Sequence, residues 1–216
     1  MKVELIIPSN LSEITLGQYQ EYLLKEEPDT EHLLSCFLNL TSKQLNHIKA
    51  TDIDYLVNHL NGLFSQEHKH VDRFTLNGVT YGFIPNLDDI TYGENKDVTT
   101  YINDWQEIHK AMAVLYRPIK HTLGSKYTVE EYTAEEDANL MRLMPLSAVM
   151  GSMVFFYNLT NELLKAIPSY LEREMEDSVH KQTLVENGAA LEKSIHLLKE
   201  TLQDLTQLQN FRYTYA

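Results

Sequence analysis

Cysteine is nearly absent from this sequence, because Cys36 is the only one among the 216 residues. A single thiol cannot build a disulfide framework within the chain, which excludes the small secreted domains that depend on one. Cys36 lies in an apolar run, residues 33–38. We therefore expect it to be a buried structural thiol.

Long apolar runs are also missing. The most apolar stretch, residues 148–159, is shorter than the roughly 18 to 20 residues that a membrane-spanning helix needs. The first eight residues contain an acidic residue, Glu4, and too short an apolar run for a signal peptide. The sequence therefore predicts neither membrane insertion nor secretion.

Basic residues are few: 18 Lys and Arg stand against 31 Asp and Glu, for a formal net charge of −13. A protein that reads the nucleic-acid backbone needs a concentrated basic face, so we expect no nucleic-acid partner. Solubility explains such an acidic balance, and docking onto a basic partner surface is the other interpretation.

Glycine is scarce, at eight residues, and the chain has no Gly-rich phosphate loop, no Gly-x-Ser-x-Gly elbow and no Cys-x-x-Cys pair. His68 and His70 are close in sequence, but surface polarity explains them better than a metal site does. Asp88 and Asp89 could be paired carboxylates, although their surroundings favour a turn leading into a helix N-terminus. We predict no catalytic residue, metal ligand or cofactor.

Helix signals fill the first third of the chain. Thr15 and Gln18 form a capping-box pattern, Pro28-Asp29-Thr30 starts a second helix, and Thr51-Asp52 is expected to cap a third. Residues 3–7 alternate partly and end at a proline, which suits a short edge strand.

A β-hairpin is expected at 70–85, where apolar residues alternate on both sides of Asn77-Gly78. A third strand is expected within 126–132, which is rich in β-branched and aromatic residues. We further expect a helix capped by Asp104 and closed by Arg117-Pro118, and a nearly all-round apolar helix at 145–167 in the centre of the core.

After Pro168 the apolar residues thin out to a stripe spaced three and four apart, which is a heptad pattern. This seam either packs back onto its own domain or pairs with another chain, and a second copy is one such partner. The aromatic end is either an exposed docking tail or a frayed end. The predicted partner-binding residues are Leu191, Ile195, Leu198, Leu202, Leu205, Phe211, Tyr213 and Tyr215, with Leu184 at the start of the stripe.

The predicted fold is mainly α, of the α+β class. A helical globular domain with a small antiparallel sheet takes residues 1–167, and a helical arm with an aromatic tail takes 168–216. Size and composition are those of a chain that buries its own core without metals or disulfides.

Five stretches of the sequence carry a resemblance to a known family: 14–19, 81–94, 109–119, 144–147 and 154–159, which read ITLGQY, YGFIPNLDDITYGE, HKAMAVLYRPI, MPLS and VFFYNL. Together, over about residues 1–165, the chain resembles a family of tailed-bacteriophage virion-morphogenesis proteins similar to tail assembly chaperones. The resemblance implies binding to tape-measure, tail-tube or neck proteins, in the cytoplasm of the infected bacterium or in the virion.

Three functions based on binding follow: a tail assembly chaperone, a structural virion component such as a neck or tail ring or adaptor subunit, and a host-directed helical binding module. The seam supplies a contact surface in each of them. Catalysis is the interpretation with least support, because no motif carries it.

Overall fold

A computed structural model describes residues 5–133 and 138–176 of the chain, with only the backbone for Thr160 and for 163–176. The fold is α+β and mainly helical, with one four-stranded antiparallel sheet, which confirms the predicted class. The chain divides into two compact units, residues 1–152 and 153–216, and each is described by itself.

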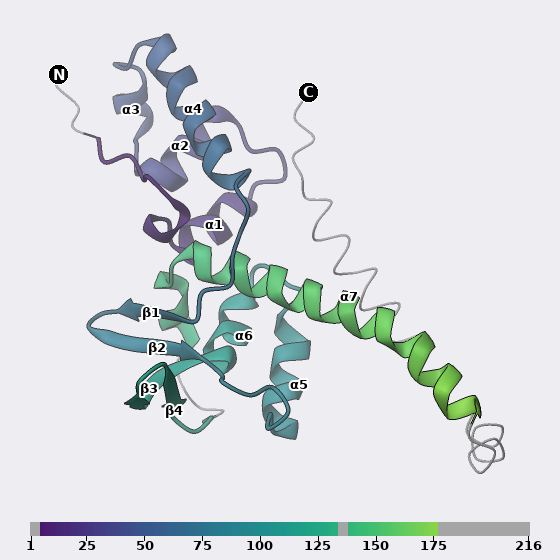
Figure 1. Cartoon of the computed structure of the whole chain (residues 1–216). Coiled ribbons are helices and arrows are strands. Elements are labelled where there is room, and N and C mark those ends of the chain that lie inside the picture. Colours follow the sequence, from purple (N-terminus) through teal and green to yellow (C-terminus); the bar gives the residue numbers. More distant parts are fainter. Residues whose placement is uncertain (1–4, 134–137, 177–216) are drawn as a thin grey trace. The chain divides into compact units, whose positions relative to one another are not determined.

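Short helices make up the first part of unit 1: η1 (Leu11–Glu13), α1 (Leu16–Leu23), α2 (Thr30–Leu38), α3 (Ser42–Leu45) and α4 (Ala50–Phe64). Figure 1 shows them gathered together. α1 begins at the predicted capping box of Thr15 and Gln18, and α2 begins after Asp29, whose side chain accepts a hydrogen bond from the His32 N–H. α3 carries a second capping box that was not predicted. α4 starts after Lys49, without a side-chain cap, so the predicted cap at Thr51-Asp52 is wrong.

The predicted hairpin is confirmed. β1 (Arg73–Leu76) pairs with β2 (Val79–Phe83), and the turn residues Asn77 and Gly78 have φ of 51° and 81°. Both values are left-handed, as a two-residue hairpin turn of the mirror-image type requires. The strands follow the order β1-β2-β3-β4, with β3 at Tyr116–Leu123 and β4 at Lys126–Val129.

Two strand predictions need correction. Residues 5–7 are not in a strand, and residues 1–4 lie outside the described part. The third predicted strand exists as β4, but it ends at Val129 and pairs with β3, where the sequence indicated the end of a helix. Pro118 is tolerated in β3 because it lies beside the irregularity between Ile119 and His121, where regular pairing is interrupted.

Two helices lie between β2 and β3: α5 (Tyr92–Tyr101) and α6 (Ile108–Leu115). Asp104 does not cap α6; its carboxylate accepts a hydrogen bond from the Gln106 N–H in the preceding turn. Asp88 and Asp89 do not cap α5 either, since Thr91 is the N-cap. They lie in the preceding turn, which the Asn86 side chain closes.

Two distant segments meet at the centre of unit 1 in matching conformations. Residues 11–16 and 141–146 each run from a 3₁₀ turn through one bridging residue into an α-helix, and Thr15 pairs with Pro145 in an isolated antiparallel bridge. The Leu16 N–H donates to the Met144 carbonyl at 3.0 Å, and the Leu146 N–H donates to the Ile14 carbonyl at 2.8 Å. The four residues are fully buried. This reciprocal pair joins the start of α1 to η2 (Ala138–Leu143) and to the start of α7 (Leu146–Glu176).

α7 departs from its prediction in length and in burial. It continues through Pro168 to Glu176 instead of ending at 167. Its first two turns are mostly buried up to Ser152, whereas from Met153 to Leu159 every side chain is half-buried or, at Asn158, exposed. The prediction that this apolar helix lies in the centre of the core therefore holds for its start, up to Ser152, and is wrong for residues 153–159. The units divide at Ser152, so the predicted domain boundary at 167/168 falls inside α7, and it stays a prediction.

Candidate functional site: a polar pocket beside helices α5 and α6

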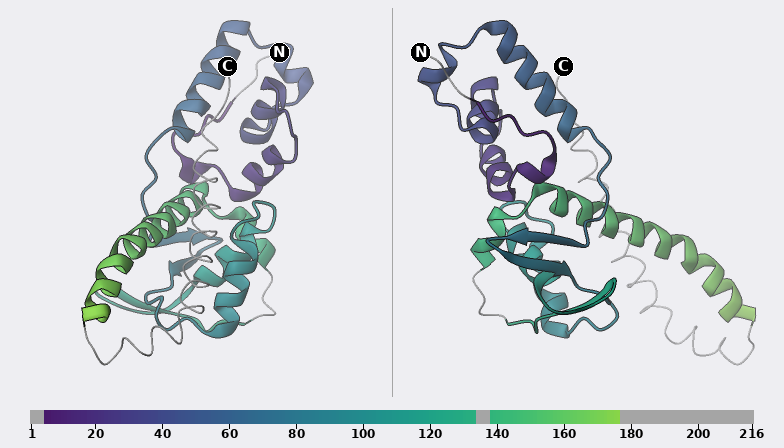
Figure 2. Two further views of the ribbon diagram at one scale, coloured as in Figure 1. Left: turned by 90° about the vertical axis from the view of Figure 1, so that its right-hand side faces the viewer. Right: turned by 60° about the vertical axis from the view of Figure 1, so that its left-hand side comes forward.

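A pocket of about 310 Å³ opens in unit 1, lined by α5, α6 and the residues on either side of 134–137. The views in Figure 2 show α5 and α6 side by side. The polar side chains that line the pocket are Asp97, Tyr101, His109, Lys110, Tyr132, Thr133 and Asn139. Since these residues come from three separate segments, the pocket depends on the tertiary fold.

Tyr132 and Asp97 form one side of the pocket. The Tyr132 hydroxyl donates a hydrogen bond to the Asp97 carboxylate. Burial, together with that hydrogen bond and the charge of Asp97, raises the pKa of Tyr132 to about 12. The phenol is therefore protonated at neutral pH and acts as a hydrogen-bond donor.

Lys110 supplies the positive charge of the pocket. Its ammonium group forms an ion pair with Glu107 on the preceding turn and lies 5.0 Å from the centre of the Tyr101 ring. The hydrogen bond to Glu107 is the main cause of the raised pKa of Lys110. Lys110 therefore stays charged and is not set up as a neutral amine nucleophile.

His109 connects the pocket to the core. It is only 5% exposed, and its Nδ1 lies 3.2 Å from the Nε2 of Gln20, which is fully buried on α1. The same Gln20 amide donates to the Trp105 and Gln106 carbonyls at 2.8 and 3.2 Å. Burial, then the nearby positive charge of Arg142, lowers the pKa of His109. The ring is therefore neutral at neutral pH, and its Nδ1 shares the two hydrogens of the Gln20 amide with the two carbonyls.

A buried ion pair links α5 to the sheet close to this site. The Arg117 Nη1 lies 3.0 Å from the Glu94 Oε1, and the other oxygen of Glu94 accepts a hydrogen bond from the Thr91 N–H at 2.6 Å. Burial opposes the charge on Glu94, but the Thr91 hydrogen bonds and Arg117 outweigh it and hold the pKa of Glu94 below its ordinary value. Both charges are therefore kept inside the fold.

The pocket is suited to binding. Tyr132 and Lys110 hold their protons more firmly than usual, and His109 stays deprotonated. A general acid or base works best with a pKa near the working pH, and these shifts move all three away from it. The arrangement offers a phenol, an ammonium group and a carboxylate to a small polar group.

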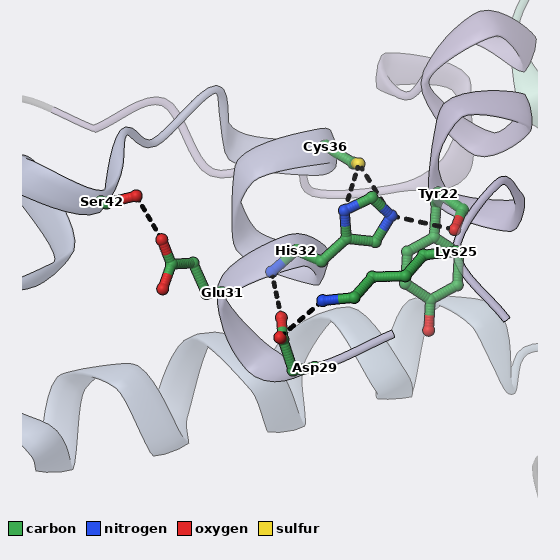
Figure 3. A network of polar contacts seen from close by, with 7 residues as sticks. All are labelled: Tyr22, Lys25, Asp29, Glu31, His32, Cys36 and Ser42. Carbon is green, nitrogen blue, oxygen red and sulfur yellow. Dashed lines mark hydrogen bonds and ion pairs between the residues drawn. The ribbon is translucent and has the colours of Figure 1, made fainter. Parts of the chain in front are cut away.

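Cys36 and His32 form a second cluster, on α2 (Figure 3). The Cys36 sulfur lies 3.7 and 3.9 Å from the two ring nitrogens of His32, and the Nε2 of that ring is 3.1 Å from the Tyr22 carbonyl. A carbonyl only accepts, so Nε2 carries the hydrogen. Burial, followed by the charge of Glu21, raises the pKa of the Cys36 thiol. A reactive thiolate needs the opposite shift, which leaves Cys36 as the buried structural thiol that the sequence predicted.

Within residues 5–133 and 138–176, no group of three or more metal-ligating side chains comes together. His68 and His70 are both partly buried, and burial lowers the pKa of each. No helix of the described part is long and apolar enough to cross a membrane.

The sequence-predicted partner residues, from Leu191 to Leu205 together with Phe211, Tyr213 and Tyr215, lie outside the described residues. Sequence reasoning in turn missed the pocket, because its residues are spread from 97 to 139 and share no motif. The one local sequence pattern that indicates part of this site is the Thr91–Glu94 capping box, which fixes the start of α5.

Comparisons of this chain with models of protein families, with curated proteins and with solved structures gave no match.

Proposed function

We propose that this protein assembles bacteriophage tails or virions by binding other proteins, as a tail assembly chaperone. The observation that supports it is the incomplete burial of α7 after Ser152. Met153, Val154, Phe155, Phe156 and Leu159 follow one another on this helix, and none of them is buried. An amphipathic or all-apolar helix with half-exposed side chains is a surface on which a partner helix packs.

Charge and exposed side chains favour the same role. A protein that holds an apolar client must itself stay soluble, and the net charge of −13 serves that purpose. Unit 1 also exposes large apolar side chains, with Leu24 at 68%, Tyr55 at 63% and Leu123 at 86%. The resemblance of residues 1–165 to virion-morphogenesis proteins makes a tape-measure or tail-tube protein the expected client.

A structural subunit of the neck or tail is the second candidate, because it would need the same apolar contact surface. The two differ in one observable: a chaperone leaves before the virion is complete, and a subunit stays in it.

The test combines mass spectrometry of purified virions with capture of the tagged protein from infected cells. We expect the protein to be absent from virions and to capture a tape-measure or tail-tube protein. Stoichiometric presence in virions would establish the structural subunit instead, and capture of a host protein alone would overturn both phage roles.

A matched pair of variants links the capture to α7. Leu159→Asp places a charge on a half-exposed apolar position and should abolish capture, whereas Asn158→Asp places the same charge on the neighbouring exposed position and should leave it unchanged. Equal capture by both variants would show that this part of α7 is not the contact.

A further inference from the structure

Asp97 carries the one charge in the pocket beside α5 and α6 that no described residue neutralises. Its carboxylate is half-buried, and the described hydrogen bond that it accepts comes from the neutral hydroxyl of Tyr132. Lys110, the other charged residue of the lining, forms an ion pair with Glu107 at the start of α6. Since Glu107 compensates the charge of Lys110, the charge that remains in the pocket is negative.

Two ionisable side chains of the lining respond to this negative surrounding. Burial is the first cause of the raised pKa of Tyr132, and the hydrogen bond to Asp97 and the charge of Asp97 act in the same direction. The pKa of Lys110 is raised first by its hydrogen bond to Glu107 and further by the charge of Glu107. His109 differs, because burial is the first cause of its lowered pKa. The charge effects on Tyr132 and Lys110 both favour positive charge in this place.

The remaining lining fits an alkyl chain that carries such a charge. Ala113, Val114 and Ala138 line the pocket with short apolar side chains. The Tyr101 ring lines it as well, and the Lys110 ammonium group lies 5.0 Å from the centre of that ring, so the ring already contacts one ammonium group. The volume of about 310 Å³ is at the small end of the range for ligand pockets, which is roughly 300–1,000 Å³. The pocket therefore suits a small ligand.

We propose that this pocket binds a primary alkylammonium group. The positive charge of the ligand pairs with the Asp97 carboxylate, the Tyr132 oxygen accepts a hydrogen bond from it, and its alkyl chain lies against the short apolar side chains. Free small amines and the lysine side chains of a partner protein both present this group, and the probes chosen below separate the two sources. The pocket uses none of the α7 side chains that are proposed to bind the client, so the two proposals fail or hold independently.

Three ligands of similar size and different charge test the proposal on the full-length wild-type protein. n-Butylammonium, n-butanol and n-butyrate are titrated at constant ionic strength, and the backbone amide signals of α5 and α6 are followed by NMR. We expect saturable shifts with n-butylammonium, with a dissociation constant about tenfold or more below that of n-butanol. Similar affinity of these two ligands, tighter binding of n-butyrate, or no saturable shift would overturn the proposal.

A matched pair of variants locates the binding. Asp97→Asn removes the charge but keeps an oxygen that accepts the Tyr132 hydrogen bond, and it should weaken the binding of n-butylammonium about tenfold or more. Asp54→Asn removes the same charge from an exposed position on α4 and should leave the affinity unchanged. Equal effects of the two changes would mean that the cation responds only to the net charge of the protein, and the assigned site would be wrong.

A second variant keeps every charge, and it decides the matter if Asp97→Asn does not fold. Ala113→Leu fills the pocket with a larger apolar side chain and should abolish the binding of n-butylammonium, whereas unchanged binding would overturn the site. Lysine with an acetylated amino terminus and an amidated carboxyl terminus is the probe for a protein source. Binding at least as tight as that of n-butylammonium assigns the pocket to a lysine side chain of a partner, and weaker binding assigns it to a free amine.

Discussion

Gly82 on β2 is the residue whose lack of a side chain matters most to the sheet. A Cβ at this position would lie 2.4 Å from the Tyr127 ring, which crosses over the glycine. The Tyr127 hydroxyl donates to the Phe83 carbonyl at 2.7 Å, and the Arg73 guanidinium lies 4.5 Å from the centre of the ring. Tyr127 thus fastens β4 over β2, although β3 lies between them.

We expect Gly82→Ala to lower the free energy of unfolding by about 1–3 kcal/mol, because the new methyl group must displace the Tyr127 ring. Gly62→Ala is the matched control: it lies inside α4 with no atom within 4 Å of a new Cβ, and helix propensity should raise stability by about 0.5–1 kcal/mol. Urea unfolding of both variants checks this. Equal effects of the two changes would contradict the proposed role of Tyr127.

His109 makes stability depend on pH. Because the folded state lowers the pKa of His109, the unfolded chain takes up a proton first as the pH falls through its ordinary value of about 6.5. The free energy of unfolding should therefore fall as the pH is lowered below that value. His109→Gln keeps an acceptor for Gln20 but cannot take up the proton, so melting temperatures between about pH 7 and 5 should depend less on pH. An unchanged slope would show that His109 does not contribute.

At the scale of elements, the Glu94–Arg117 pair holds α5 against β3. Both residues are at least 91% buried, and the Nε of Arg117 has no hydrogen-bond partner among the described residues. Arg117 therefore relies on Glu94 for most of its compensation inside the fold. Removing one charge of such a pair costs far more than removing both, because it leaves the other charge buried and uncompensated.

We expect Glu94→Gln to lower the free energy of unfolding by about 3–5 kcal/mol. The double variant Glu94→Gln/Arg117→Met should be markedly more stable than the single variant, since it also removes the stranded charge. Denaturant unfolding with an unchanged m-value checks both. If the double variant is the less stable of the two, the pair does not act as a unit.

Elements with a local signal could be predicted from the sequence, and those without one could not. Asn77-Gly78 and the Thr15–Gln18 capping box each determine local structure through interactions within four residues. The hairpin turn and the start of α1 are both present where these patterns predicted them. β3 was missed because α6 passes directly into it, with no glycine or polar break between Leu115 and Tyr116. Its strand character comes from pairing with β2, which lies more than thirty residues earlier. The pocket was missed for the same reason, as it exists only where α5 and α6 meet Tyr132, Thr133, Ala138 and Asn139.

At the scale of the whole molecule, the burial of α7 beyond Ser152 was predicted wrongly from the sequence. Amino-acid composition does not show at which residue a helix stops being buried. Gly151 marks the place: a Cβ there would lie 2.1 Å from the Lys69 carbonyl, so the backbone at 69–70 presses directly against the helix. One residue later, Ser152 donates to the Ala148 carbonyl and contacts the Tyr116 hydroxyl at 3.0 Å. Among the α7 side chains that the structure describes, these are the last buried ones, and the half-buried part begins at Met153.

The reciprocal bridge between residues 14–16 and 144–146 also affects when the chain can fold during its synthesis on the ribosome. The backbone groups of Ile14 and Leu16 leave the exit tunnel well before their partners, which are made roughly 130 residues later. Because loop closure must precede the pairing, the first helices remain without their central contact until α7 begins to emerge. A nascent chain that is truncated before residue 146 cannot complete this bridge, so a premature stop there should leave a chain that cellular proteases remove.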